Sequence, residues 1–148
     1  MYTVTKTFGE YPFAHRQHNH DGHCAYVHGH NWRFTVELQS EDLDENGFVY
    51  DFGKFGWLKS WLEFMFDHTL LINQDDPHLE FFQEHCVKDA KNPLGLWDMR
   101  VIPNGSAEHL AELVGRRIQT HFEDDTRIQL VSLTVMEDNK NAAVWRPE

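Results

Sequence analysis

The residues best suited to chemistry are histidines gathered in one stretch, His15 to His30, which reads HRQHNHDGHCAYVHGH. This stretch holds six of the eleven histidines and one of the two cysteines. Its end, His28-Gly29-His30, runs into a segment, 32–38, where apolar and polar residues alternate as in a half-buried strand. Residues two apart on a strand point to the same face, so His28 and His30 are predicted to project side by side.

Two imidazoles placed in this way need one more nitrogen to form the three-ligand metal site, with an open position, that is typical of catalytic zinc. We take His15 as the third ligand. His18, His20 and His23 stay open as alternatives, because they lie in the same histidine-rich stretch. The other interpretation is a solvated histidine-rich loop, since a short HxH motif also occurs in unrelated proteins.

Composition limits the class of protein. With 148 residues, 41% of them hydrophobic, the chain is long and apolar enough to form one domain with its own core. No apolar run approaches a membrane span and the first residues do not resemble a signal peptide, which predicts a cytoplasmic protein. A net charge of -11 disfavours nucleic acid and anionic membranes as partners. It also means that an anionic substrate needs a local cationic site.

Hydrophobic periodicity and turn residues predict an α+β fold, with an antiparallel sheet and two helices on one of its faces. Asp51 and Ser106 are the expected N-caps of the two helices. Residues 74–103 are expected to form an insert within this single domain, 1–148. The expected strands and helices are, in chain order, strands at 2–8, 32–38 and 48–50, a helix at 51–67, a short helix at 78–86, a helix at 106–122, and strands at 128–137 and 142–145.

The two cysteines have different expected roles. Cys24 lies four residues before His28, and a thiolate next to a metal and imidazoles is stabilised, which suits a nucleophile or a proton acceptor. The alternatives are that Cys24 is a zinc ligand or that it is an inert buried residue. Cys86 is predicted to be buried and inert, and a disulfide between the two is not expected in a reducing compartment.

Three further sites carry carboxylates that could take part in a pocket. Asp67-His68 places a carboxylate next to an imidazole that it could orient, although adjacent pairs of this kind are common by chance. Glu108 and Glu137 lie at the ends of expected elements, where a carboxylate reaches either a pocket or solvent.

Together these segments resemble the 6-pyruvoyltetrahydropterin synthase superfamily, and most closely its bacterial 6-carboxytetrahydropterin synthase branch. The resemblance covers residues 1–73 and 103–147. It rests on six motifs that occur in the family's order: Pro12-Phe-Ala-His15, Cys24-Ala-Tyr-Val-His28-Gly29-His30, Gly47-Phe-Val-Tyr-Asp51-Phe52, Asp67-His68, Ser106-Ala-Glu108 and Val135-Met-Glu137.

The resemblance implies the tunnelling fold (T-fold), a four-stranded antiparallel sheet assembled into trimeric barrels that stack as hexamers, with active sites between subunits. It also implies one zinc ion and a reaction that converts 7,8-dihydroneopterin triphosphate into 6-carboxytetrahydropterin, triphosphate and acetaldehyde, on the route to queuosine and other deazapurine nucleosides. The implied zinc ligands are His15, His28 and His30. The implied proton-transfer triad is Cys24, Asp67 and His68. The implied pterin-binding residues are Glu108 and Glu137.

The sequence departs from the family pattern near its motifs. Gly105 stands where the family usually has proline, the segment after Asp67-His68 is one residue longer, and the insert is longer than the usual link. One alternative is 6-pyruvoyltetrahydropterin synthase activity, a triphosphate elimination, which Val27 disfavours because variant branches tend to carry glutamate there. Others are a non-catalytic zinc- or pterin-binding paralogue and a metal-buffering protein.

Overall fold

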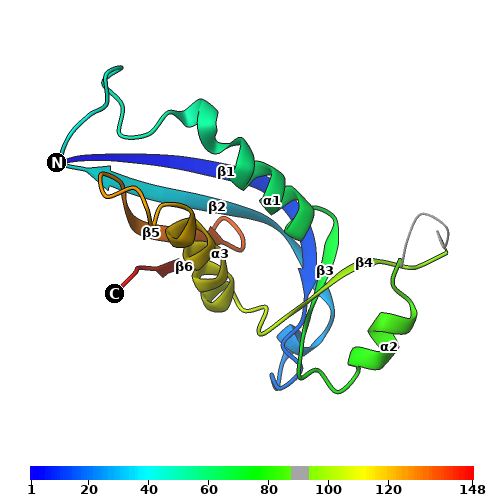
Figure 1. The fold of residues 1–148 in the computed structure, drawn as a ribbon. Helices are drawn as coiled ribbons and strands as arrows, with labels where there is room; N and C mark the ends of the chain where they lie inside the picture. The colour runs from blue at the N-terminus through cyan, green and yellow to red at the C-terminus, as the bar shows by residue number, and fades with distance from the viewer. Residues whose placement is uncertain (88–93) are drawn as a thin grey trace.

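A single curved sheet of six strands, in the order β4-β3-β1-β2-β5-β6, forms the body of the protein (Figure 1). A computed structural model describes residues 1–87 and 94–148. In those residues, no helix is long and apolar enough to cross a membrane. The elements are, in chain order, β1 (Tyr2–His15), η1 (His23–Ala25), β2 (His28–Ser40), η2 (Phe52–Phe55), α1 (Gly56–Phe66), β3 (Thr69–Asn73), α2 (Leu79–Glu84), β4 (Asp98–Ile102), α3 (Ala107–His121), β5 (Gln129–Met136) and β6 (Ala142–Trp145).

The long antiparallel pair β1–β2 carries the site. Both strands are longer than predicted, and they include all three histidines of the expected metal site. A bulge between Gly9 and Tyr11 shifts the register of β1. Because side chains alternate along a strand, this one-residue shift moves the core-facing set of β1 from even to odd positions, from Phe8 to Tyr11. The bulge thereby sets His15 on the core face, directly opposite His28.

Helices α1 and α3 pack into the same core, α1 over β1 and α3 over β5 and β6 (Figure 1). Both predicted caps are present. The Asp51 side chain accepts a hydrogen bond from the Gly53 amide at 2.8 Å and begins η2, which leads into α1. The Ser106 hydroxyl accepts one from the His109 amide and begins α3. The predicted helix at 51–67 is therefore a 3₁₀ turn followed by a shorter α-helix.

The expectation of a four-stranded antiparallel sheet is wrong, because β3 and β4 extend the sheet and run parallel to β1. Every residue of β3 is buried. Parallel strands covered on both faces read as unbroken apolar runs, so Thr69–Asn73 lacked the alternation that marks a half-buried strand. Since β4 comes from residues expected to form the insert, part of this insert belongs to the main sheet.

The predicted strand at Phe48–Tyr50, and its pairing across the Asn46-Gly47 turn, are also wrong. The Asp44 carboxylate accepts hydrogen bonds at 2.9 Å from the amides of Asn46 and Phe48, which closes a tight loop instead. Val49 is 2% exposed and packs into the core from this loop. The partners of β2 are β1 and β5.

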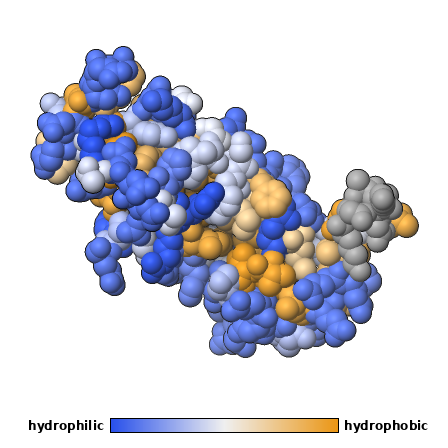
Figure 2. Space-filling model, in the orientation of Figure 1, coloured by the Kyte–Doolittle hydropathy of each residue, from blue (hydrophilic) through white to orange (hydrophobic). Residues whose placement is uncertain are grey.

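The part of the chain between β3 and β4 forms a second, smaller apolar cluster with β3, built on Leu70, Ile72 and Phe82. Here Cys86 is partly exposed, which corrects the prediction that it is buried, and its backbone forms an isolated β-bridge with Trp97. Residues 88–93, which are part of the expected insert, lie outside the described residues. Figure 2 shows hydrophobic side chains gathered toward this end of the molecule, whereas the opposite end is mostly hydrophilic.

Candidate metal centre and its pocket

Three imidazoles meet where β1 ends and β2 begins. His15 pairs with His28 across the two strands, and His30 lies two pairs further along, opposite Phe13. The ring centroids of His15 and His28 are 4.6 Å apart, and those of His28 and His30 are 5.1 Å apart. Trp32, which is fully buried, packs edge-on against His15 and His30. The cluster is thus built on the rigid edge of the core.

Backbone carbonyls fix the protonation of two of these rings. His15 Nδ1 lies 2.7 Å from the Gly105 carbonyl oxygen, and His28 Nδ1 lies 2.6 Å from the Tyr26 oxygen. A carbonyl only accepts, so each Nδ1 donates and each Nε2 keeps a free lone pair when the ring is neutral. Burial lowers the pKa of His15 to about 4, against the opposing effect of the Gly105 hydrogen bond. His15 is therefore neutral at pH 7.

A carboxylate completes the cluster. Glu137, directly after β5, places Oε1 at 3.4 Å from His15 Nε2 and 3.3 Å from His30 Nε2. One ligand atom from each of these four residues lies within 4.8 Å of the others, the only such group found in the described part of the chain. His15 Nε2 and His30 Nε2 are buried without a hydrogen-bond partner. Buried nitrogens are normally paired, and imidazole with carboxylate is a common zinc donor set, so the residues fit a metal ion.

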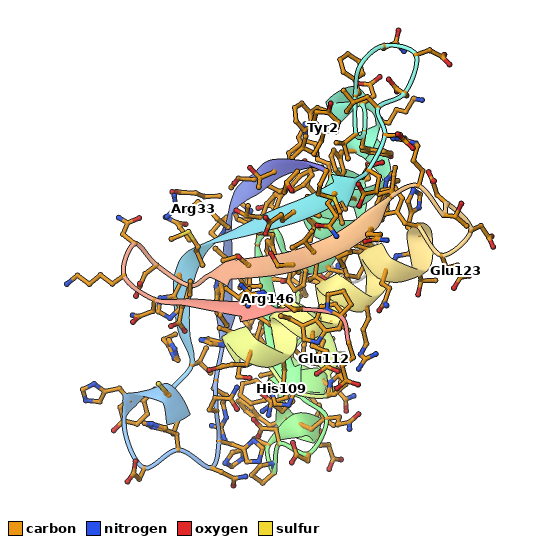
Figure 3. All side chains as sticks on the ribbon, turned by 90° about the vertical axis from the view of Figure 1, so that its left-hand side faces the viewer. Tyr2, Arg33, His109, Glu112, Glu123 and Arg146 are labelled. Atoms are coloured by element: carbon orange, nitrogen blue, oxygen red, sulfur yellow. The ribbon has the colours of Figure 1, made fainter. Side chains whose placement is uncertain are left out.

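A pocket of about 590 Å³ opens beside this cluster. Its walls include His15 and Glu137 from the cluster, Cys24 from η1 and Glu108 from the first turn of α3. Cys24 is exposed, and its carbonyl accepts a hydrogen bond from the Gln17 amide that closes the loop between β1 and β2. In Figure 3 this light-blue loop lies at the same end of the molecule as the start of α3, near the labelled His109.

A network of amide side chains fixes the backbone that holds His15. Asn73, 2% exposed at the end of β3, accepts a hydrogen bond from the Gly105 amide at 2.8 Å. It donates to Gln17 at 3.1 Å, and Gln17 donates to Asn104 at 3.0 Å. The chain of contacts therefore runs from β3 through Gly105 to the ring of His15. Sequence analysis missed this network; its one available signal was a polar residue ending the apolar run of β3.

Asp67 and His68 lie elsewhere, in the turn between α1 and β3. The Asp67 carboxylate lies 2.7 Å from His68 Nδ1, and the His68 side chain is 80% exposed. The His68 amide donates to the Pro12 carbonyl, which fixes the turn to β1. Neither residue is part of the pocket wall. One chain thus brings together the predicted ligands, Cys24 and the two glutamates, but not the Asp67–His68 pair.

The remaining histidines of the loop stand outside the metal cluster. His18 lies 3.9 Å from carboxylate oxygens of both Asp75 and Asp76. His20 lines the pocket, with Nδ1 accepting from the Gly22 amide. The ring of His23 stacks near Tyr26. Sequence analysis left these three open as ligands and assigned Glu137 to the pterin alone, so it did not foresee a carboxylate among the donors.

Comparison with known proteins supplies a family for this arrangement. The family model described as 6-pyruvoyl tetrahydropterin synthase matches residues 3–148. A Rickettsia typhi protein named 6-carboxy-5,6,7,8-tetrahydropterin synthase is 32% identical over 86% of this chain and 88% of its own length. A protein of the same name from Rickettsia conorii is 33% identical over 53% of this chain. That match spans 57% of the R. conorii protein, so the chain spans little more than half the length of this relative.

Solved structures show the same fold at lower identity. A protein of Wolinella succinogenes superposes with a TM-score of 0.84 at 20% identity, covering 99% of this chain and 98% of that one. The 6-pyruvoyl tetrahydropterin synthase of Caenorhabditis elegans superposes with a TM-score of 0.62 at 22% identity, covering 100% and 98%. At these identities the likeness concerns the fold.

Proposed function

The chain belongs to the 6-pyruvoyl tetrahydropterin synthase family, and from this premise we propose that it is a zinc-dependent 6-carboxytetrahydropterin synthase. The substrates would be 7,8-dihydroneopterin triphosphate and one water molecule, and the products 6-carboxy-5,6,7,8-tetrahydropterin, triphosphate and acetaldehyde, in the queuosine pathway of the cytoplasm. The observation that carries the proposal is the cluster of His15, His28, His30 and Glu137 in the wall of a pocket that also holds Cys24.

His15, His28 and His30 would hold the zinc through their free Nε2 atoms. A zinc ion supplies Lewis-acid polarisation of the hydroxyl groups on a substrate side chain. The chain's own contribution begins with the Gly105 and Tyr26 carbonyls, which keep two of these rings in the tautomer that presents Nε2. Outer contacts of this kind orient metal-bound imidazoles and raise their basicity.

Two pocket carboxylates would hold the pterin ring. Glu137 can accept two N–H groups from the guanidine-like edge of a pterin, and charge-assisted bidentate contacts of this kind are strong and directional. Glu108 lies in the same wall and offers a second carboxylate. Cys24 projects from the opposite loop, where its thiolate can take a proton from the substrate side chain held between these groups.

The proton-transfer partner would come from a second subunit. Asp67 fixes one nitrogen of His68 by a 2.7 Å contact, and the exposed ring has its other nitrogen available to a neighbouring molecule. The proposed assembly is a trimer doubled to a hexamer. Two features support it: β4 is an edge strand of the sheet, and exposed apolar residues, Phe64 and Val101 among them, lie near this edge. Open edges and apolar patches are commonly covered by other subunits.

The reaction is tested by mass spectrometry of the products formed from dihydroneopterin triphosphate by zinc-loaded protein. We expect 6-carboxytetrahydropterin and acetaldehyde, and their loss in Cys24→Ala. Cys86→Ala is the matched control, because Cys86 lies between α2 and β4, outside the pocket wall. A 6-pyruvoyl product without acetaldehyde would replace the proposed reaction by triphosphate elimination. Unchanged substrate with tight pterin binding would identify a non-catalytic binder.

The shared site is tested by mixing two inactive variants. Cys24→Ala and His68→Ala each lack one half of the proposed proton-transfer set, but a mixed interface contains one intact set. Partial recovery of activity after subunit exchange is expected. Exchange verified by mass spectrometry of labelled subunits without any recovery would contradict the shared site.

A further inference from the structure

We propose that Glu137 is an exchangeable fourth ligand of the metal, bound to it in the resting protein and withdrawn from it when a pterin binds. The first half of this proposal stands on the geometry of the metal centre. The second half rests on the proposed function, because it takes the pterin as the molecule that competes for the carboxylate.

Two separations in the cluster, from Glu137 to His15 and from Glu137 to His30, are those of neighbouring ligands on one ion. Donor atoms of a tetrahedral zinc site lie about 2.0–2.1 Å from the metal, and therefore about 3.3 Å from one another. Glu137 Oε1 lies 3.4 Å from His15 Nε2 and 3.3 Å from His30 Nε2. The carboxylate thus already stands at ligand-to-ligand distance from two of the three imidazoles, with the third within 4.8 Å.

His15 Nε2 and Glu137 Oε1 repel one another unless a cation lies between them. The Nε2 atom of His15 presents a lone pair, because Nδ1 donates to Gly105, and the Glu137 Oε1 atom that faces it at 3.4 Å carries lone pairs of its own. The Nε2 atoms of His15 and His30 are buried without a hydrogen-bond partner. Water therefore does not relieve the repulsion from their side. A metal ion between them would accept the lone pairs of both atoms, and on this ground we assign Glu137 as a ligand.

The same carboxylate cannot serve metal and pterin together. A bidentate contact to two N–H groups uses both carboxylate oxygens, whereas a metal bond removes one of them. Glu137 borders both the metal cluster and the pocket that contains Glu108, so a rotation of its side chain suffices to exchange partners. Its backbone stays in place, since its amide donates to Asn141 in the turn between β5 and β6. Pterin binding would then free one metal position for the substrate's hydroxyl groups.

The ligand assignment is tested with cobalt(II), whose visible spectrum reports the number and type of ligands. Wild type, Glu137→Gln and Glu108→Gln are loaded with Co²⁺, and the affinity is measured by competition with a chelator. Outer-shell variants typically cost 10–100-fold in metal affinity, so loss of a direct ligand should weaken Glu137→Gln by at least about tenfold. Glu108→Gln, in the same pocket but outside the cluster, should match wild type. Equal affinities and spectra in all three proteins would overturn the assignment.

The exchange is tested with unsubstituted pterin, which lacks a side chain that could itself reach the metal. Its binding is measured by fluorescence, independently of the cobalt spectrum. We expect the wild-type spectrum to change with the same midpoint as the fluorescence, and to approach that of Glu137→Gln. Saturating pterin with an unchanged spectrum would overturn the exchange but leave the pterin pocket intact. Absence of pterin binding would overturn the exchange together with the proposed function, while the affinities above still decide the ligand assignment.

Discussion

Replacing Asn73 by alanine should weaken metal binding although Asn73 does not touch the metal cluster. In the structure Asn73 accepts from the Gly105 amide at 2.8 Å, and the Gly105 carbonyl accepts from His15 Nδ1 at 2.7 Å. The substitution leaves a buried amide unpaired, which costs about 1–3 kcal/mol of folding stability. It also frees Gly105 to shift, and loss of an outer-shell contact to a metal ligand typically lowers affinity by about 10–100-fold.

The assay is the zinc dissociation constant, measured by competition with a chromophoric chelator, together with urea unfolding of the metal-free protein. Gly115→Ala is the matched control for destabilisation alone. A Cβ there would clash with Trp145 Cε3, on the side of α3 that packs against β6, and overpacking of this kind costs about 1–3 kcal/mol. Asn73→Ala should lose affinity and Gly115→Ala should keep it. Similar affinities in two equally destabilised variants would refute the positioning role of Asn73.

Three further predictions follow from the site. His28→Ala should lose bound zinc in metal analysis whereas His18→Ala should retain it, because His18 faces acidic residues outside the cluster; equal losses would refute the ligand set. A thiol reagent should modify exposed Cys24 before partly exposed Cys86, with loss of activity, and equal rates with activity retained would contradict a reactive Cys24. Gly9→Ala should lower the free energy of unfolding by about 1–3 kcal/mol and reduce zinc binding, because the φ angle of Gly9 is 120° and a Cβ would meet a backbone oxygen at 2.6 Å. Unfolding and zinc content that stay unchanged would contradict the role of the bulge in placing the metal site.

Two of the candidate metal-binding histidines were predictable because their geometry is local. Two residues separated by one position on a strand share a face whatever the rest of the fold does, so His28 and His30 could be placed from spacing alone. Both lie in β2 as that pattern predicted, and the alternation from Trp32 onward correctly identified the buried face of this strand. The helix beginning at Ser106 was predictable for a similar reason, since its cap is formed within one turn.

The position of His15 and the contacts of Glu137 with the histidines depend on the register between paired strands, which the spacing of residues in the sequence does not reveal. Without the bulge after Gly9, His15 would share a face with Thr7, on the side of the sheet away from the helices. Glu137 reaches the cluster because β5 pairs with β2 so that Met136 stands opposite Arg33. Such pairings join residues about one hundred positions apart, and they are decided by packing of the whole sheet.

The two added strands show a different limit. Thr69–Asn73 is buried throughout, and a short unbroken apolar run is compatible with a strand or with a buried piece of helix. What identifies it as a strand is its position between β1 and β4, which places Asn73 behind Gly105. Asn73, the last residue of β3, therefore supports the candidate metal centre from within the part of the chain that carries the family resemblance, whereas only β4 comes from the expected insert.

Asp67 and His68 lie apart from the pocket of their own chain. This leads to a last prediction, that metal binding needs one chain whereas turnover needs two. All four candidate ligand atoms come from one chain, so an isolated protomer should keep its zinc. The Asp67–His68 pair does not line that chain's pocket, so the same protomer should lack a complete proton-transfer set. Charged substitutions at the edge of β4, such as Val101→Lys, should favour protomers, because Val101 is exposed on the edge strand. Light scattering, zinc content and product formation, measured on one preparation, should then show protomers with full zinc and little activity. Protomers that turn over as fast as the assembly would show that one chain suffices, and loss of zinc on dissociation would show that the metal centre itself needs a neighbour.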